Sequence, residues 1–262
     1  MKKVSVIIPL YHGIKYVDKL LEMMNQNYKR LSKNHDMEVI FIKDSEEDFD
    51  RNIFFDKSTD LSVKLLLNNK NYGIQYSRVK GIQNASGDYV HMLDQDDEIT
   101  EDFMENALNK IGKADVLVCN GKKQFSDYQQ YKVLYKYYFM QWTVKHKWFY
   151  TKFSCRILSP GQCLINKDAI PSAWMDNILK NSGVDDAFLW LLMLSAGCRF
   201  DIDRQIRYIH NHTGVNLSSD TEKMKLSLLE MLDICKREKC LDKHSIQRME
   251  SNLNNRKKHK LN

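Results

Sequence analysis

A short apolar run near the N-terminus constrains the fold more than any other feature of the sequence. Val4–Leu10 is VSVIIPL, which is typical of a strand buried on both faces, and the apolar spacing from Val17 to Met24 then follows a helical period. Strands that alternate with helices indicate the α/β class, with a mostly parallel central sheet flanked by helices. Further strands are predicted at Met37–Ile42, Val63–Leu67, Tyr89–Leu93, Asp115–Cys119 and Gln162–Asn166, and further helices at Tyr76–Gln83, Glu101–Lys110 and about Asp185–Ser195.

The net charge of +6 conceals an uneven distribution. Residues 236–262 hold nine basic side chains against three acidic ones, and residues 128–167 hold seven basic side chains and no acidic one. The rest of the 262-residue chain is therefore acidic by about seven charges. Such an acidic part would repel phosphate, and no recognition motif is present, so nucleic acid is not an expected partner.

Cysteine spacing and hydropathy bear on the compartment. The six cysteines include no C-x-x-C pair, which argues against a zinc site or a disulfide framework and favours reduced thiols, mostly in the core. No segment has the apolar core of a signal peptide or the roughly 20 apolar residues of a membrane span. We expect a cytoplasmic protein, with a position at the inner face of the membrane as an alternative.

Polar side chains follow three of the predicted strands. Pro9–Gly13 ends the first strand, Lys43–Ser45 the second and Asp94–Asp97 the strand that begins at Tyr89. In open parallel sheets, ligands bind beyond the carboxyl ends of the strands. An aromatic ring, a carboxylate and a carboxylate cluster predict a nucleotide site, with a ring to stack on the base, an acceptor for its N–H group and oxygens for a divalent cation.

Four segments together resemble the signatures of the inverting family 2 glycosyltransferases, which have the GT-A nucleotide-sugar-binding fold. They are VSVIIPLYHGIKYV, EVIFIKDSEED, NYGIQYSRVKGIQNASGDYVHMLDQDDEIT and VDDAFLWLLML, and their order and spacing carry the resemblance over residues 4–218. The resemblance implies a GT-A domain over residues 1–218, with a donor half to about 120 and an acceptor half from about 121. Residues 219–262 should form a helical, basic extension, since Ser219 and Glu222 match a capping box.

By this resemblance, Asp94-Gln95-Asp96 matches the DXD motif, with Asp96 as the direct ligand of Mn²⁺ or Mg²⁺ and Asp94 as the contact to ribose or metal-bound water. Carboxylates at a strand end suit such a cation, which neutralises charge on a departing diphosphate. The alternative is an acidic loop that caps a helix beginning near Thr100.

Other positions match the donor pocket of the family. Tyr11 matches the ring that stacks on uracil, and Asp44 matches the acid that reads the base, so a UDP-sugar is expected. Lys43 departs from the common Asp-Asp-Gly-Ser pattern, which leaves the base selectivity open. The remaining matches are Pro9, Asn71, Gly73 and Arg78, the last either a phosphate contact or a solvated helix arginine.

The pair Asp185-Asp186 matches the acidic pair of the family, in which the second member is the general base. A carboxylate suits the removal of a proton from an acceptor hydroxyl, and an adjacent carboxylate raises the pKa of one member of the pair. Asp185 is also a candidate helix cap. Trp190 matches a recurrent tryptophan of the acceptor side.

Two further segments resemble the family more weakly. Ser159–Gln162 resembles the floor of the acceptor side, which gives Gln162 an acceptor role, although a plain turn explains it nearly as well. Tyr208–Ser218 resembles a polar closing motif in which a histidine approaches the metal or diphosphate, and His210 is the candidate, with a structural histidine as the alternative.

The stretch Tyr131–Phe153 holds ten aromatic residues among its basic ones. Three interpretations stay open: packed helices, a wall on which an acceptor sugar stacks, or a surface that meets anionic lipid headgroups. Core packing is the default expectation for most of these rings. Peripheral contact with an anionic membrane is the less favoured alternative.

The sequence therefore predicts an inverting, metal-dependent glycosyltransferase that acts on a saccharide or lipid-linked saccharide in bacterial surface-polysaccharide synthesis. One alternative is an inactive sugar-nucleotide-binding or scaffold protein, for which Lys43 is the hint. Another is a nucleotidyltransferase, which would need a Gly-rich phosphate loop that Pro9–Gly13 lacks.

Overall fold

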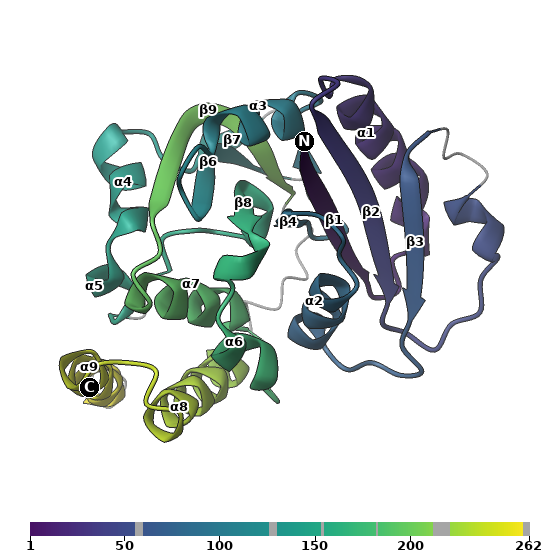
Figure 1. The fold of residues 1–262 in the computed structure, drawn as a ribbon. Helices are drawn as coiled ribbons and strands as arrows, with labels where there is room; N and C mark the ends of the chain where they lie inside the picture. The colour runs from purple at the N-terminus through teal and green to yellow at the C-terminus, as the bar shows by residue number, and fades with distance from the viewer. Residues whose placement is uncertain (56–59, 126–129, 153–154, 182, 212–220, 259–262) are drawn as a thin grey trace.

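The computed structural model describes residues 1–55, 60–125, 130–152, 155–181, 183–211 and 221–258. These residues form one mixed sheet with helices on both faces (Figure 1). The strands are β1 (Lys2–Leu10), β2 (His35–Lys43), β3 (Ser62–Leu67), β4 (Tyr89–Met92), β5 (Glu98–Ile99), β6 (Val116–Gln124), β7 (Tyr131–Val133), β8 (Cys163–Asn166) and β9 (Phe200–Asn211). The α-helices are α1 (Val17–Lys29), α2 (Ile74–Gln83), α3 (Phe103–Lys110), α4 (Tyr138–Trp142), α5 (Lys147–Tyr150), α6 (Ser172–Asp176), α7 (Asp185–Ser195), α8 (Thr221–Arg237) and α9 (Lys243–Lys258).

The strand order is β3-β2-β1-β4-β8-β6-β9-β5, and β7 pairs with β6 beyond β8. Strands β1 to β4 run parallel to one another, as the sequence predicts. β8 then enters antiparallel between β4 and β6, while β6 and β9 are parallel. The α/β class is confirmed, and the mostly parallel arrangement describes the first half of the sheet better than the second.

Strand β1 supplies the centre of both layers of the core. Val6 and Ile8 pack in the cluster that contains α1 and α3, whereas Ile7 faces the cluster that contains α2 and α7. Strand side chains alternate between the two faces, so a strand covered by helices on both sides must be apolar throughout. This is why VSVIIPL is so informative: its carboxyl end opens at the edge of the sheet where β2 and β4 also end.

The C-terminal extension is helical, as predicted. α8 contributes Leu228, Met231 and Leu232 to the cluster that also holds α7. Ser219, the predicted cap, and the predicted boundary at residue 218 both lie outside the described residues, so the division into domains stays a prediction. Within the part of the chain that the structure covers, no helix combines the length and apolar character of a membrane span.

One buried carboxylate ties the parallel strands together. Glu38 of β2 is 1% exposed, and its Oε1 accepts hydrogen bonds from Ser5 Oγ at 2.6 Å and from the Ser86 amide at 2.7 Å. Its Oε2 lies 2.8 Å from Lys64 Nζ of β3. Burial raises the pKa of Glu38, but these hydrogen bonds outweigh burial and lower it to about 2. The charge on Glu38 is thus stabilised by groups from three segments.

We expect Glu38→Gln to lower the free energy of unfolding by about 2–4 kcal/mol at neutral pH, because Lys64 and the serine donors lose a charged acceptor. A carboxyl with a depressed pKa stabilises the fold above its unfolded pKa and loses that contribution as pH falls, so the difference from wild type should shrink between about pH 5 and pH 2. Urea unfolding at several pH values measures this. Asp36→Asn, which removes a more exposed partner of Lys3, is the control and should change stability by less than about 1 kcal/mol.

Candidate active site

The ends of β1 and β4 are fixed to each other by the middle residue of the DXD segment. Gln95 Oε1 accepts from the Tyr11 amide at 2.9 Å, and Gln95 Nε2 donates to the Tyr11 carbonyl at 3.1 Å. A Cβ at Gly13 would lie 2.1 Å from Gln95 Oε1, so any larger residue there would push the Gln95 side chain away from this position. Pro9 is buried in β1, while the Tyr11 ring is 51% exposed at the sheet edge. The predicted stacking ring is therefore open to a ligand.

Asp44, at the end of β2, organises the loop that leads into α2. Its carboxylate accepts hydrogen bonds from Asn68 Nδ2 at 2.8 Å and from the amides of Tyr72 and Gly73, each at 2.9 Å. The Asn71 side chain accepts a second hydrogen bond from the Gly73 amide, and Gly73 has a φ of 92°, a conformation that favours glycine. The structure thus brings Asp44, Asn71 and Gly73 together as predicted. The base-reading role of Asp44 stays a prediction.

Lys43, the departure from the family pattern, points into the loop that follows β2. Its Nζ donates to the Ser45 carbonyl at 2.8 Å and lies 5.0 Å from the centre of the Phe49 ring. The side chain is buried beneath residues 45–49. The substitution is thus accommodated by local contacts.

Arg78 of α2 joins the DXD segment to the acidic pair. Its Nη2 lies 2.5 Å from Asp94 Oδ1, and its Nη1 lies 2.7 Å from Asp185 Oδ2. The side chain is 4% exposed, so the interpretation as a solvated helix arginine is wrong. Burial lowers the pKa of the guanidinium, but the charges of Asp94, Asp185 and Asp186 outweigh burial and raise it. Arg78 therefore stays charged between the two acidic groups.

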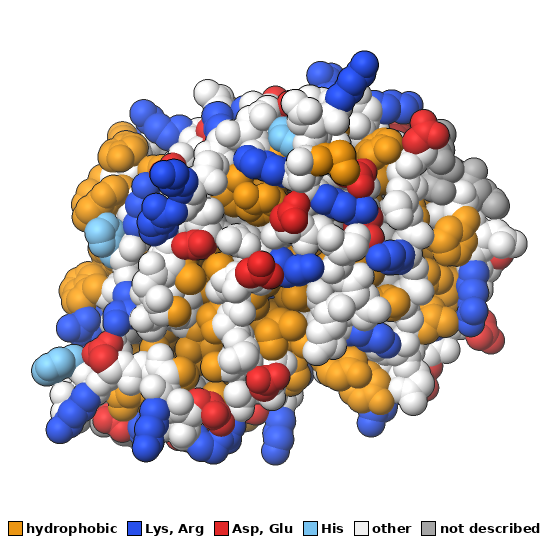
Figure 2. All heavy atoms as spheres, viewed as in Figure 1, with side chains coloured by type: hydrophobic (Ala, Val, Ile, Leu, Met, Phe, Trp, Pro, Cys, Tyr) orange, Lys and Arg blue, Asp and Glu red, His pale blue; other side chains and the backbone are white. Residues whose placement is uncertain are grey.

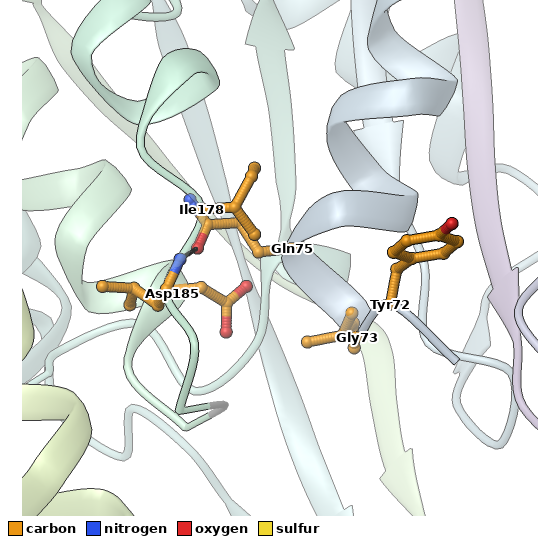
Figure 3. A pocket seen from close by; sticks show the side chains of 7 residues that line it. Tyr72, Gly73, Gln75, Ile178 and Asp185 are labelled. Atoms are coloured by element: carbon orange, nitrogen blue, oxygen red, sulfur yellow. Dashed lines mark hydrogen bonds between the residues drawn. The ribbon is translucent and has the colours of Figure 1, made fainter. Parts of the chain in front are cut away.

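The acidic pair begins α7 without capping it. The Asp185 side chain pairs with Arg78, no side chain caps this helix, and the Asp185 carbonyl accepts from Trp174 Nε1 at 2.8 Å. Gln75 of α2 reinforces this junction, since its amide donates to the Trp174 carbonyl at 3.0 Å and accepts from the Leu179 amide at 2.9 Å. Figure 3 shows Asp185 and Gly73 on opposite sides of a hollow between α7 and the start of α2. Cap formation is therefore not the role of Asp185.

Asp186 has the chemistry of a base that works near neutral pH. Burial raises its pKa most, the neighbouring Asp185 raises it further, and Arg78 partly opposes the shift, which leaves the pKa at about 7. Its Oδ1 accepts from the Ala187 amide at 2.6 Å. A carboxylate with a pKa near the working pH both ionises and accepts protons effectively.

The DXD loop is held from behind by the acid that follows it. Asp97 is fully buried, accepts from the Tyr208 hydroxyl, and lies 3.1 Å from His210 Nδ1. The Asn211 amide donates to Asp97 at 3.1 Å, and Asn211 Nδ2 donates to the Asp96 carbonyl at 2.9 Å. Burial raises the pKa of Asp97 to about 6, despite the hydrogen bond with His210. Burial lowers the pKa of His210, but Asp97 outweighs burial and raises it.

The acidic loop does not cap α3. That helix begins at Phe103, beyond Thr100, and the residue at its N-cap is Asp102, whose side chain accepts no capping hydrogen bond. The side chain of Asp94 pairs instead with Arg78 and accepts from Ser159 Oγ at 3.2 Å. The helix-cap alternative for Asp94 is therefore wrong.

Asp96 is the carboxylate with the least protein contact in the loop. Burial and the charge of Asp94 raise its pKa, and within the described residues no other side chain donates a hydrogen bond to it. Those residues contain no group of three or more acidic, histidine or cysteine side chains that would hold a metal alone. Mg²⁺ and Mn²⁺ bound with substrate phosphates commonly take only one or two carboxylates. Asp96 and Asp94 fit that arrangement, whereas Nδ1 of His210 is directed to Asp97.

Two predicted acceptor-side residues lie in the interior. Gln162 is fully buried, accepts from the Leu158 amide at 2.7 Å, and donates to the Cys119 carbonyl at 3.1 Å. Trp190 is also fully buried and packs edge-on against Phe200. Both side chains are thus held by interior contacts, and an acceptor contact by either stays a prediction.

Sequence reasoning missed three contacts that build this site. Gln75, Ser159 as a partner of Asp94, and Asp97 as the anchor of β9 carry no local signal, because each contacts a residue far away along the chain. Only the position of Asp97 directly after the DXD segment hinted at a role.

Comparison with known proteins agrees with this geometry. Residues 5–173 match the model of glycosyl transferase family 2. A Haemophilus influenzae protein called an uncharacterized glycosyltransferase is 32% identical over 131 residues, which cover 48% of this chain and 49% of that protein. The matched segment thus spans about half the length of that relative.

Two solved structures are similar in fold. Staphylococcus aureus TarS in complex with UDP-GlcNAc has a TM-score of 0.61 at 19% identity, over 88% of this chain and 67% of that one. The Pyrobaculum calidifontis mannosyltransferase PcManGT, in complex with GDP-Man and Mn²⁺, has a TM-score of 0.65 at 14% identity, over 90% and 64%. At these identities the likeness establishes the GT-A type fold.

The model of this family covers residues 5–173, which is more than half of the chain. The chain therefore belongs to glycosyl transferase family 2.

Proposed function

We propose that this glycosyltransferase moves a sugar, with inversion, from a UDP-sugar to a saccharide or lipid-linked saccharide in surface-glycan synthesis. The observation that carries the proposal is the double ion pair of Arg78 with Asp94 and Asp185. One guanidinium thus contacts both Asp94, in the loop assigned to the donor diphosphate, and Asp185, the neighbour of the proposed base. Such proximity is what a single displacement between two bound substrates requires.

The donor is assigned to the edge formed by β1, β2 and β4. The exposed Tyr11 ring would stack on the base, and the loop at Asp44, with Pro9, Asn71 and Gly73, would line the nucleoside. Similar structures carry UDP-GlcNAc in one case and GDP-Man with Mn²⁺ in the other, which supports a nucleotide sugar and a divalent cation. UDP is preferred because Tyr11 and Asp44 match the uracil contacts of the family.

The cation is assigned to Asp96 and Asp94, with the donor phosphates as further ligands. When bound, it supplies positive charge that stabilises the departing diphosphate. His210 is the weaker candidate, because its Nδ1 already pairs with Asp97. Its imidazole holds the loop in place whichever group its other nitrogen contacts.

The chemical step assigned to Asp186 is removal of the acceptor proton. The acceptor oxygen forms a bond to the anomeric carbon, its proton moves to the Asp186 carboxylate, and the bond from that carbon to the diphosphate oxygen breaks. The nucleoside diphosphate leaves with the electron pair, and a single displacement inverts the anomeric centre. Burial and the charge of Asp185 raise the pKa of this base, and Arg78, which pairs with Asp185, partly opposes them, so that the pKa lies near 7.

Neither alternative function accounts for these features as well. A scaffold protein would have no need for a base with a pKa of about 7 beside the DXD loop. A nucleotidyltransferase would need a phosphate-binding Gly-rich loop after β1, and the residues there are Tyr11, His12 and Gly13.

Asp96→Ala should abolish the part of UDP binding that depends on Mn²⁺, because it removes the carboxylate assigned to the cation. Calorimetric titration of UDP with and without Mn²⁺ measures this. Glu101→Ala, which removes an exposed partner of Arg30, is the control and should bind as wild type does. Equal UDP affinity of wild type with and without Mn²⁺ would contradict the metal assignment.

Asp186→Asn should keep UDP affinity and lower the transfer rate by about 10²–10⁴-fold, the usual contribution of a general base. In wild type, kcat/KM should fall about tenfold per pH unit below about pH 7, because only the ionised carboxyl accepts the proton, and it should level off above. Initial rates with a panel of nucleotide sugars measure both. Asp201→Asn, an exposed partner of Lys145, is the matched control. Transfer that survives in Asp186→Asn would move the base elsewhere.

A further inference from the structure

The aromatic stretch forms an exposed edge of the molecule, which overturns the expectation of core packing. Sixteen large apolar side chains are exposed among the residues that the structure describes, and nine of them lie between residues 125 and 158. In Figure 2, side chains of this kind protrude over the elements that Figure 1 labels α4 and α5. We name six of them the aromatic edge: Tyr137, Tyr138, Phe139, Met140, Trp142 and Trp148, which are 37–65% exposed.

The aromatic edge is held in place from its inner side. Gln141 is 1% exposed and donates to the carbonyls of Val118 at 3.1 Å and Asp203 at 2.7 Å. Tyr150 is buried, and its hydroxyl donates to the Val144 carbonyl at 3.1 Å. The rings therefore face outward because the opposite side of the same segment is anchored to β6 and β9.

Basic side chains lie among these rings. Lys152 Nζ is 3.7 Å from the centre of the Trp148 ring, Lys136 Nζ is 5.4 Å from that of Tyr137, and the Arg204 guanidinium is 5.8 Å from that of Tyr138. These three cations form no ion pair with another described residue, although Lys145 and Lys147 do. The edge thus combines apolar rings with three basic side chains that are unpaired among the described residues.

The fold also brings the second basic segment to this edge. Lys147 of α5 pairs with Asp242, just before α9, at 2.7 Å. Asn252 Nδ2 of α9 donates to the Thr151 carbonyl at 3.2 Å. The described parts of the two segments with the largest local excess of basic over acidic residues, 128–167 and 236–262, are therefore in contact.

We propose that the aromatic edge, with the basic side chains of Lys136, Lys152 and Arg204 beside it, docks on a bilayer that contains anionic lipid headgroups. Tyrosine and tryptophan favour the membrane interface, where the ring is apolar and the polar group is hydrated, and each basic residue is attracted to an anionic leaflet. A twofold contact with a second copy would place this basic surface against itself. The positive charge of the edge therefore favours contact with an anionic headgroup layer and disfavours contact with a second copy of the chain.

Co-sedimentation with vesicles tests the proposal without requiring enzyme activity. Wild type should bind vesicles of equal parts phosphatidylglycerol and phosphatidylcholine, bind phosphatidylcholine alone much more weakly, and dissociate at high salt. Phe139→Ser with Trp148→Ser, or Lys136→Glu with Lys152→Glu, should weaken binding at least about tenfold. Tryptophan emission of wild type should shift to shorter wavelength on binding.

Matched controls place the same changes elsewhere on the surface. Phe55→Ser removes an aromatic ring that is 46% exposed near β3, and Lys29→Glu with Lys33→Glu makes the same change in charge at the end of α1. Both should bind the vesicles as wild type does. The proposal is overturned if wild type ignores anionic vesicles, if the controls lose binding as much as the edge variants, or if sedimentation shows a dimer that the edge variants dissociate. Unchanged UDP binding by the edge variants shows that they are folded.

Discussion

The buried guanidinium of Arg78 is the interaction on which the arrangement of this site depends. Two carboxylates, Asp94 from the loop after β4 and Asp185 from the start of α7, would each be costly to bury without a partner. Arg78 forms an ion pair with each of them and fixes their spacing through the fork of its guanidinium. Because a buried ion pair costs desolvation energy, its value here lies less in stability than in geometry. Asp186, next to Asp185, takes its position and its pKa from the same arrangement.

Acidic and basic side chains gather on different edges of the folded protein, which the net charge of +6 does not reveal. The acidic side chains of the site sit at the edge where β1, β2 and β4 end. The basic segments meet on another edge, at α5 and α9. A cation and a nucleotide diphosphate suit the first edge, and an anionic surface suits the second. A protein with both can hold a charged donor while an acceptor is offered from a different direction.

The sequence was informative wherever a signal is local. The alternation of strands and helices predicted β1 to β4, α7 and the α/β class, and the polar groups after each strand predicted which side chains gather at one edge of the sheet. Partners could not be predicted, because Arg78 and Asp185 are 107 residues apart and nothing near either one encodes the pair. Because this partner is distant in sequence, the local pattern around Asp185 indicated a helix cap. The prediction that the aromatic rings pack in the core was wrong for a different reason. The number of rings does not reveal which side of α4 faces the sheet, and the buried side is the one that carries Gln141, which hydrogen-bonds to β6.

The most direct test of the role of Arg78 is the pH dependence of transfer by Arg78→Met, compared with Arg30→Met at an exposed surface pair. Methionine occupies similar space without the charge that lowers the pKa of Asp186. The account predicts that the acidic limb of kcat/KM moves to higher pH in Arg78→Met and that affinity for UDP with Mn²⁺ falls, while Arg30→Met behaves as wild type. An acidic limb and an affinity that are both unchanged in Arg78→Met would contradict it.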